Sequence, residues 1–238
     1  MEQKIVPEKT IVLRPKPLSD VQIVANKKKT SFYGTVFNRP KPEEVDISSI
    51  DLYYEPYWIV GGQYTVDYFR KSIYEIATGP EVKEVVIGKG TFPVRTKSGT
   101  WKKIRSSIKV GEKENILNIP VEEHVELDIE DEITINAQGK EIKFRYKMKS
   151  EDFENFPEDV LKNNENHVRH CVVNKEQAVD TLIKILHEDI DNEIRILNEK
   201  VVIDRLDQVY VPVYEARCVD SNNKVETMRI DGMDLKIL

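Results

Sequence analysis

The sequence predicts an α+β protein made of two duplicated units, each a helix followed by an antiparallel meander, with a β-rich insertion between them. The first observation is a repeat: Asp51–Pro56 and Asp207–Pro212 share the pattern Asp-x-x-Tyr-x-Pro. The second is that the upstream apolar residues match at the same spacing. The matching pairs are Val45 with Val201, Ile47 with Ile203, and Ile50 with Leu206.

The third observation concerns the helices that precede the two copies. Helix starts are expected at Leu18 and Asn174, which lie equally far before Pro56 and Pro212. We therefore divide the chain into five segments. These are an extended N-terminal arm (1–17), a first helix-plus-sheet unit (18–90), an inserted β-module (91–150), a linker (151–172) and a second helix-plus-sheet unit (173–238).

Composition indicates a soluble globular chain. Its 238 residues are 39% hydrophobic and 33% charged, which is typical of folded domains. The formal net charge of -6 argues against a protein that coats nucleic acid, because that role needs a basic surface. Two cysteines, Cys171 and Cys218, are too few for a disulfide scaffold. Without a signal peptide or a run long enough to span a bilayer, the expected compartment is the cytoplasm.

The first unit is expected to begin with a helix over 18–38 that is interrupted near Gly34. Strands follow from Val45, and Gly61-Gly62 predicts a hairpin turn between two of them. Further turns are predicted at 78–80 and 88–90, on either side of a strand over 82–87. The repeated Arg-Pro-Lys-Pro at 14–17 and 39–42 disfavours a helix, since proline lacks the backbone donor.

The insertion reads as all-β and has segregated charge. Residues 95–113 are mainly basic, and residues 122–132 are mainly acidic. Alternating apolar residues predict strands around 125–129 and 142–148, with a turn at Gln138-Gly139.

The second unit repeats the order of the first. A helix is expected from Asn174 to Leu186, then strands over 194–203 and 207–219. A turn at 220–223 leads to a strand over 225–230. Asp231-Gly232 then predicts a tight turn into a final strand over 233–238.

The aromatic and proline residues of the repeat are the candidate partner-binding residues, because Tyr and Trp are favoured anchors at interfaces. They are Tyr54, Pro56, Tyr57, Trp58, Tyr210, Pro212 and Tyr214. The alternative is that these side chains point inward and form core, which large aromatics often do.

The basic run suggests a second role, since single-strand binders combine cations with stacking aromatics. The candidates are Arg95, Lys97, Trp101, Lys102, Lys103 and Arg105. The favoured alternative is that this run pairs with the acidic segment 122–132, within the module or across an oligomer interface.

His167, His170 and Cys171 form the one candidate metal set. No second paired motif accompanies them, so neither a metal nor a catalytic pair is expected. No phosphate loop or dinucleotide fingerprint is present, and no cofactor is expected.

The sequence therefore favours a non-catalytic protein-binding, adaptor or scaffold subunit of a larger cytoplasmic assembly, with a protein partner or a second copy. An accessory single-stranded nucleic-acid binder is the first alternative. An enzyme or metal protein that uses His167, His170 and Cys171 is the second.

Overall fold

The computed structural model describes residues 2–33, 39–96, 115–188 and 194–238, and these fall into two compact units. The larger unit contains the described residues of Glu2–Tyr64, Ile129–Glu188 and Val201–Leu238. The smaller unit contains those of Thr65–Asp128 and Asp189–Lys200. Both are built from separated parts of the chain, because the long strands pass from one unit into the other.

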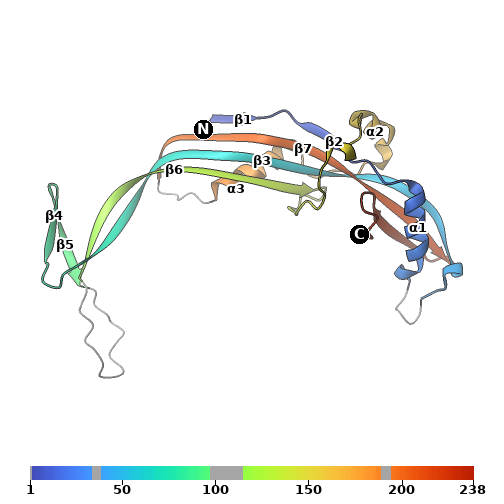
Figure 1. Ribbon diagram of the computed structural model, residues 1–238, viewed down its shortest axis with the longest axis horizontal. Coiled ribbons are helices and arrows are strands. Elements are labelled where there is room, and N and C mark those ends of the chain that lie inside the picture. The colour runs from blue at the N-terminus through green and yellow to red at the C-terminus, as the bar shows by residue number, and fades with distance from the viewer. Residues whose placement is uncertain (1, 34–38, 97–114, 189–193) are drawn as a thin grey trace, which may run out of the picture. The chain divides into compact units, whose positions relative to one another are not determined.

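The architecture is mixed α and β (Figure 1). The helices are α1 (Leu18–Lys28), α2 (Pro157–Asn163) and α3 (Lys175–His187), with short 3-10 turns at Lys29–Phe32, Pro42–Glu44, Ser150–Asp152 and Glu165–His167. The strands are β1 (Glu2–Ile5), β2 (Lys9–Val12), β3 (Val45–Thr78), β4 (Glu84–Ile87), β5 (Gly90–Thr96), β6 (Asn115–Asn136), β7 (Ile194–Asp220) and β8 (Val225–Asp231). The sheet order is β1-β7-β3-β6-β5-β4, and β2 and β8 also pair with β7.

The predicted hairpin at Gly61-Gly62 is wrong, because β3 is one continuous strand of 34 residues. Both glycines are buried inside it. A Cβ on Gly62 would meet the carbonyl oxygen of Val202 at 2.7 Å. Glycine is therefore needed here for close approach to the neighbouring strand, which is the other common role of glycine within a sheet.

Three other predicted elements differ from the structure. The first helix ends at Lys28, and its expected continuation at 34–38 lies outside the described residues. The strands expected over 194–203 and 207–219 are one strand, β7. The strand expected over 233–238 is wrong, since that segment turns back and only Ile237 bridges to Ile230.

Residues 142–149 also lack the predicted strand. Burial nevertheless alternates along the segment, as the sequence pattern suggested: Phe144, Tyr146 and Met148 are half-buried, and the charged residues between them are exposed. Phe144, Tyr146 and Met148 pack on a buried cluster instead of pairing in a ladder. The pattern thus reports which side chains face the core, and not which backbone groups are hydrogen-bonded.

The helix after Asn174 and several turns are confirmed. Asn174 caps α3, since its side chain accepts from Gln177 N at 2.9 Å and its own backbone N donates to Gln177 Oε1 at 3.0 Å. The chain turns after Thr78, after Ile87, at Gln138-Gly139 and at 221–222. Gly139 has a φ of 79°, a conformation that glycine adopts without strain.

Two buried clusters can be described in the larger unit, beside other buried residues such as Leu182 and Leu186 of α3. The first joins Val21 and Ala25 of α1 to residues of β3, β7 and β8, such as Val45 and Met228. The second joins Leu13 of the N-terminal arm to residues of β3 and β7. The arm is extended, and β2 runs parallel to β7 with Lys9 opposite Asp207.

The duplication expected from the repeat is not confirmed. Both copies of the motif lie in the same compact unit, and α1 packs on strands that follow the second copy.

Candidate functional site

The two Asp-x-x-Tyr-x-Pro copies lie beside each other on β3 and β7, which are neighbours in the sheet. Ser221 N donates to the carbonyl of Glu44 at 3.0 Å. The approach of Gly62 to Val202 lies further along the same pair of strands. Residue numbers therefore fall along β7 as they rise along β3. The strands are antiparallel, and the two copies face each other across the ladder.

Most of the motif's aromatic and proline residues are buried. Tyr54 and Trp58 are each 3% exposed and Tyr214 is 5% exposed, and Pro56 and Pro212 are buried beside them. Trp58 Nε1 donates to the carbonyl of Val173 at 3.0 Å, and Tyr214 Oη donates to that of Lys16 at 2.7 Å. These residues therefore lie in the core, and two of them also bind the backbone of other segments.

Tyr57 and Tyr210 are the two half-buried members. Tyr57 lies edge-on to Phe144, with ring centroids 5.9 Å apart, within the second buried cluster. Burial raises the pKa of both tyrosines above the ordinary value. Of the seven candidates, Tyr210 offers the clearest access from a surface hollow.

That hollow is about 630 Å³ in volume and lies in the larger unit. Both motif strands and the segment before α3 contribute residues to its lining. The residues are Glu8, Pro56, Trp58, Glu165, Val168, Arg169, His170, Cys171, Val173, Asn174, Lys175, Glu176, Gln208 and Tyr210. Charges of both signs line it, and Lys175 pairs with Glu8 at 3.8 Å.

His170 and Cys171 line this hollow, but the candidate metal set is divided. His167 instead stacks on Tyr53, with ring centroids 5.0 Å apart, and its Nδ1 lies 2.8 Å from the carbonyl oxygen of Leu52. No group of three or more His, Cys, Asp or Glu side chains suited to a metal occurs in the described ranges. Within the same ranges no hydrogen bond joins Cys171 to a histidine.

The sequence did not reveal a surface network of side chains around Tyr53. The Arg169 guanidinium lies 4.0 Å from the centre of the Tyr53 ring, on which His167 also stacks. Arg169 pairs with Glu215 at 2.7 Å, and Arg229 of β8 pairs with both Glu215 and Glu55. These residues are far apart in the sequence, so no local pattern could reveal them.

A buried carboxylate was also missed. Asp231 is fully buried and accepts hydrogen bonds from Arg145, from Tyr146 Oη at 2.7 Å and from Met233 N at 2.7 Å. Burial and the Asp231 carboxylate raise the pKa of Tyr146. Asp231-Gly232 was expected only as a turn. The turn exists, and the aspartate also anchors the segment 145–146 to it.

The sheet of the smaller unit has two chemically different faces. Arg70 and Tyr74 of β3 both reach Glu123 of β6, so these three share one face. Phe69 stacks on His124 from the other face, with ring centroids 4.6 Å apart. Alternation along each strand then assigns the remaining side chains to a face.

We define the apolar face of the smaller unit by these residues of β3 and β6: Val66, Tyr68, Tyr74, Ile76, Leu117, Ile119, Val121, Val125 and Leu127. The same face also carries Ser72 and the ion pair of Arg70 with Glu123. The register places Val94 opposite Leu117 and Val85 opposite Phe92, which extends the face across β5 and β4. Ile196 of β7 joins it, because its neighbour Arg195 contacts Phe69 on the other side.

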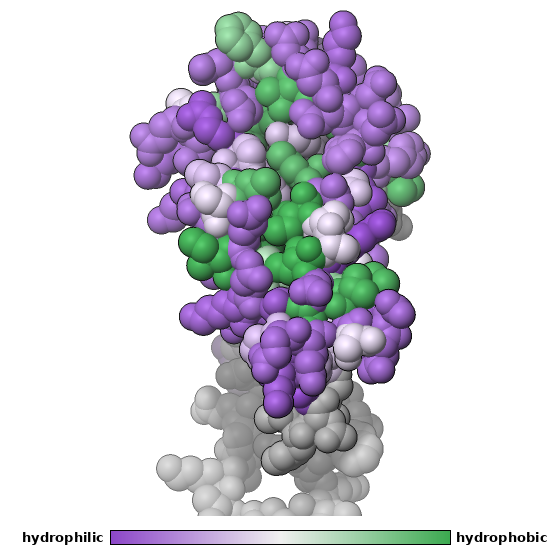
Figure 2. Space-filling model, turned by 90° about the vertical axis from the view of Figure 1, so that its right-hand side faces the viewer, coloured by the Kyte–Doolittle hydropathy of each residue, from purple (hydrophilic) through white to green (hydrophobic). Residues whose placement is uncertain are grey.

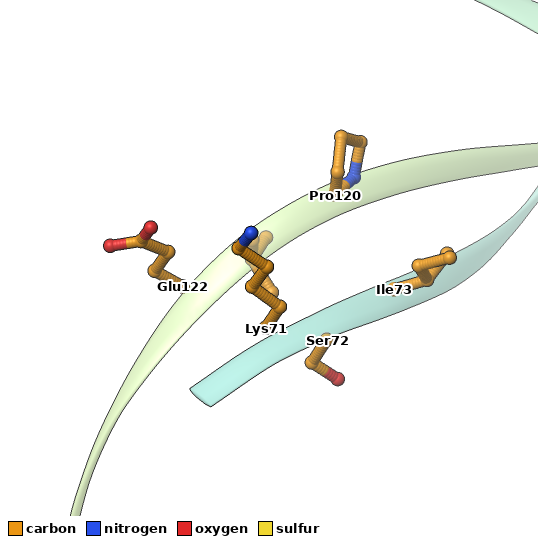
Figure 3. Close-up of a pocket in the computed structure, with 6 residues that line it drawn as sticks. Lys71, Ser72, Ile73, Pro120 and Glu122 are labelled. Atoms are coloured by element: carbon orange, nitrogen blue, oxygen red, sulfur yellow. The ribbon is translucent and has the colours of Figure 1, made fainter. Parts of the chain in front are cut away.

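The opposite face of this sheet is the acidic face. Glu122, Glu126 and Asp128 are exposed at alternate positions along β6. It carries a hollow of about 700 Å³, shown in Figure 3. Lys71 and Glu122 lie at one end of it and Ile73 and Pro120 at the other, while Ser72 points away from Lys71 and Ile73.

Most of the nucleic-acid candidates cannot be placed. Lys97, Trp101, Lys102, Lys103 and Arg105 lie outside the described residues. Arg95 is exposed on β5, opposite Ile116 of β6. The nucleic-acid alternative therefore stays a prediction.

Comparison with known proteins gives no relative for this chain: no family model, no curated protein and no solved structure matches it. None of the helices in the described ranges has the length and apolar character needed to cross a membrane.

Proposed function

We propose that this protein is a non-catalytic protein-binding subunit, and that the apolar face of the smaller unit is its contact surface. The supporting observation is that Tyr74, Ile76 and Ile196 keep 45–50% of their surface exposed. They lie on a face whose other side chains are mainly apolar, apart from Ser72 and the Arg70–Glu123 ion pair. An antiparallel sheet normally turns its apolar face to a core. A contiguous exposed apolar patch is typical of a protein interaction site.

The smaller unit has little core of its own. In its described part, the buried residues are Val66, Tyr68, Asn115 and Leu117. It also contains no helix in that part. Helices or a second sheet usually cover the apolar face of such a sheet, because a single layer buries too little surface to be stable. A partner that covers this face would supply the missing layer.

The charge distribution favours a different protein over a second copy. The chain has a formal net charge of -6, and the acidic face presents Glu122, Glu126 and Asp128 just behind the apolar face. Two copies would repel each other, whereas a partner with a basic rim would be attracted. The occupant we propose is therefore a protein with an apolar patch bordered by Lys and Arg.

A matched pair of substitutions on β3 tests the proposal. Ile76→Glu places a charge on the apolar face, and Ile73→Glu places the same charge on the acidic face. Both isoleucines are exposed in this structure, by 45% and 64%. The tagged chain, purified from cells that naturally make it, should carry a stoichiometric partner. Ile76→Glu should reduce recovery of that partner at least tenfold, and Ile73→Glu should leave it within about twofold.

Two outcomes would contradict the proposal. One is equal recovery of the same partner with both variants, provided that their circular dichroism and thermal midpoints match the unmodified chain. The other is a purified chain that light scattering shows to be a dimer, and that only Ile76→Glu converts to a monomer. That result would assign the face to a second copy.

A further inference from the structure

We infer that the larger unit carries a separate interaction site, an open edge of β3 beside α1 that takes an extended segment of a partner polypeptide as an added strand. The site lies on a different unit from the apolar face. It can therefore be tested independently of the function proposed above.

The first residues of β3 have a neighbour strand on one side. Ser221 N of the turn after β7 bonds to the carbonyl of Glu44, and Ser48 Oγ donates to the carbonyl of Arg217 at 3.2 Å. On the other side, β6 lies next to the later part of β3. Its Glu132 is close to Gly61, and the strand ends at Asn136.

The segment 45–51 therefore has β7 along one edge only. Tyr54 bridges to Val168, and nothing in the described part of the chain pairs as a strand or bridge with the outer edge of 45–51. Figure 1 shows β3 and β7 continuing together past the end of β6 toward α1. Alternate residues of a strand direct their N–H and C=O groups to opposite sides. Half of these groups in 45–51 thus face outward, where another strand can pair with them.

A hollow of about 460 Å³ runs along this edge, between α1 and the residues 46–50. The helix and its C-cap contribute Leu18, Gln22, Asn26 and Lys29, which are three or four residues apart and so form one stripe. Leu18, Ile47 and Ile50 give the hollow apolar patches. Gln22 and Asn26 give it amides that bind a peptide backbone. Peptides commonly add as a strand to an exposed sheet edge, with pockets for alternate side chains.

The surface at this end of the larger unit agrees with such a groove. Figure 2 views the molecule from the side on which Figure 1 shows α1 and β8, and a band of hydrophobic side chains runs there between hydrophilic ones.

Charge specifies one end of the occupant. Lys27, Lys28 and Lys29 occupy the end of α1, and Lys29 lines the hollow. Lys29 forms no ion pair with a carboxylate in the described ranges. Asp46 lines the same hollow but is exposed to water. The segment we propose therefore alternates apolar and small polar residues, and has a glutamate or aspartate at the end that meets Lys29.

A panel of labelled ten-residue peptides tests this proposal by fluorescence anisotropy. The peptides carry Val, Ile or Phe at alternate positions, Thr or Ser between them, and Glu at either end. At least one should bind, and a version with proline at two central positions should bind at least tenfold more weakly. Exchanging Glu for Lys should weaken binding to the natural chain and strengthen binding to the Lys29→Glu variant.

Two tryptophan substitutions in α1 provide the matched control. Asn26→Trp should fill the hollow and reduce peptide affinity at least tenfold. Lys27→Trp is exposed on the same helix but does not line the hollow, so it should change the affinity less than twofold. Ile76→Glu should leave peptide binding unchanged.

Hydrogen exchange of the backbone amides supplies an independent readout. Without peptide, the outward amides of 45–51 should exchange quickly while their inward neighbours are protected. The bound peptide should protect the outward amides. Protection of every amide in the free chain would show that this chain covers its own edge. That result, no binding by any peptide of the panel, or equal binding by the proline version would overturn the proposal.

Discussion

At the scale of single residues, Gly62 shows how a neighbouring strand determines which residue type fits at a position. Gly62→Ala should lower the free energy of unfolding by about 1–3 kcal/mol, because its Cβ would meet the backbone of Val202 at 2.7 Å. Gly61→Ala is the matched control. There the nearest atom is the Cβ of Arg205 at 3.3 Å, and a loss under about 1 kcal/mol is expected. Urea denaturation of the two variants compares them, and equal losses would contradict this explanation.

Tyr54 should make the protein sensitive to alkali. Its burial, with a smaller effect from Glu154, raises its pKa to about 12. An unfolded tyrosine loses its proton from about pH 10. The folded state therefore binds more protons between pH 10 and 12, and the free energy of unfolding must fall as pH rises through that window.

Tyr54→Phe removes this contribution. Between pH 7 and 9 the unfolding free energies of variant and natural chain should run parallel. Above pH 10 the variant should decline less steeply, by up to about 2 kcal/mol at pH 12. Denaturation at a series of pH values measures this. Parallel curves up to pH 12 would mean that Tyr54 ionises as it does in the unfolded chain.

At the scale of elements, α3 depends on its cap. Asn174→Ala should lower the free energy of unfolding by about 1 kcal/mol, because it removes the acceptor for Gln177 N and half of a reciprocal pair. Asn166→Ala, at an exposed position before the helix, should change stability by less than about 0.5 kcal/mol. Chemical denaturation followed by circular dichroism distinguishes the two. Equal effects would mean that the cap is unimportant.

Local signals predicted the elements whose physics is local. The cap at Asn174, the turn at Gln138-Gly139 and the helix from Leu18 each follow from a few adjacent residues. Gly61-Gly62 misled because a turn and a close approach of two strands both require glycine, and only the position of β7 decides between them. The strand expected over 142–148 failed for a related reason. Its alternation is real, but no ladder forms there.

The candidate site was harder to predict than the elements. The repeat drew attention to Tyr54 and Trp58, which are buried, whereas the exposed Tyr74 and Ile76 lie in a strand with no distinguishing motif. Burial of an aromatic depends on what packs above it, which one sequence does not contain. The alternation of apolar and acidic residues along 125–128 was the available signal. It could have indicated a sheet with one apolar face.

At the scale of the whole molecule, the two units should differ in local stability. Among the described residues, the smaller unit has few that are buried, whereas the larger one has many, including those of the two clusters above. Amides of 65–78 and 115–128 should therefore exchange at least tenfold faster than amides of 201–214 in the free chain. Hydrogen exchange measured by mass spectrometry tests this, and uniform protection across both units would contradict it. A bound partner should slow amide exchange in the smaller unit and leave exchange in the larger unit unchanged.

The adjacency of β3 and β7 has a consequence for biosynthesis. The ribosome makes Asp51–Pro56 long before Asp207–Pro212, yet the two lie on neighbouring strands of one sheet. In the nascent chain, β3 therefore stays without its neighbour β7 until most of the remaining sequence has emerged. Such non-local pairing slows folding and leaves an unpaired strand available to other chains. We expect the cell to shield this intermediate, and folding during synthesis to be the step most sensitive to temperature and chaperone supply.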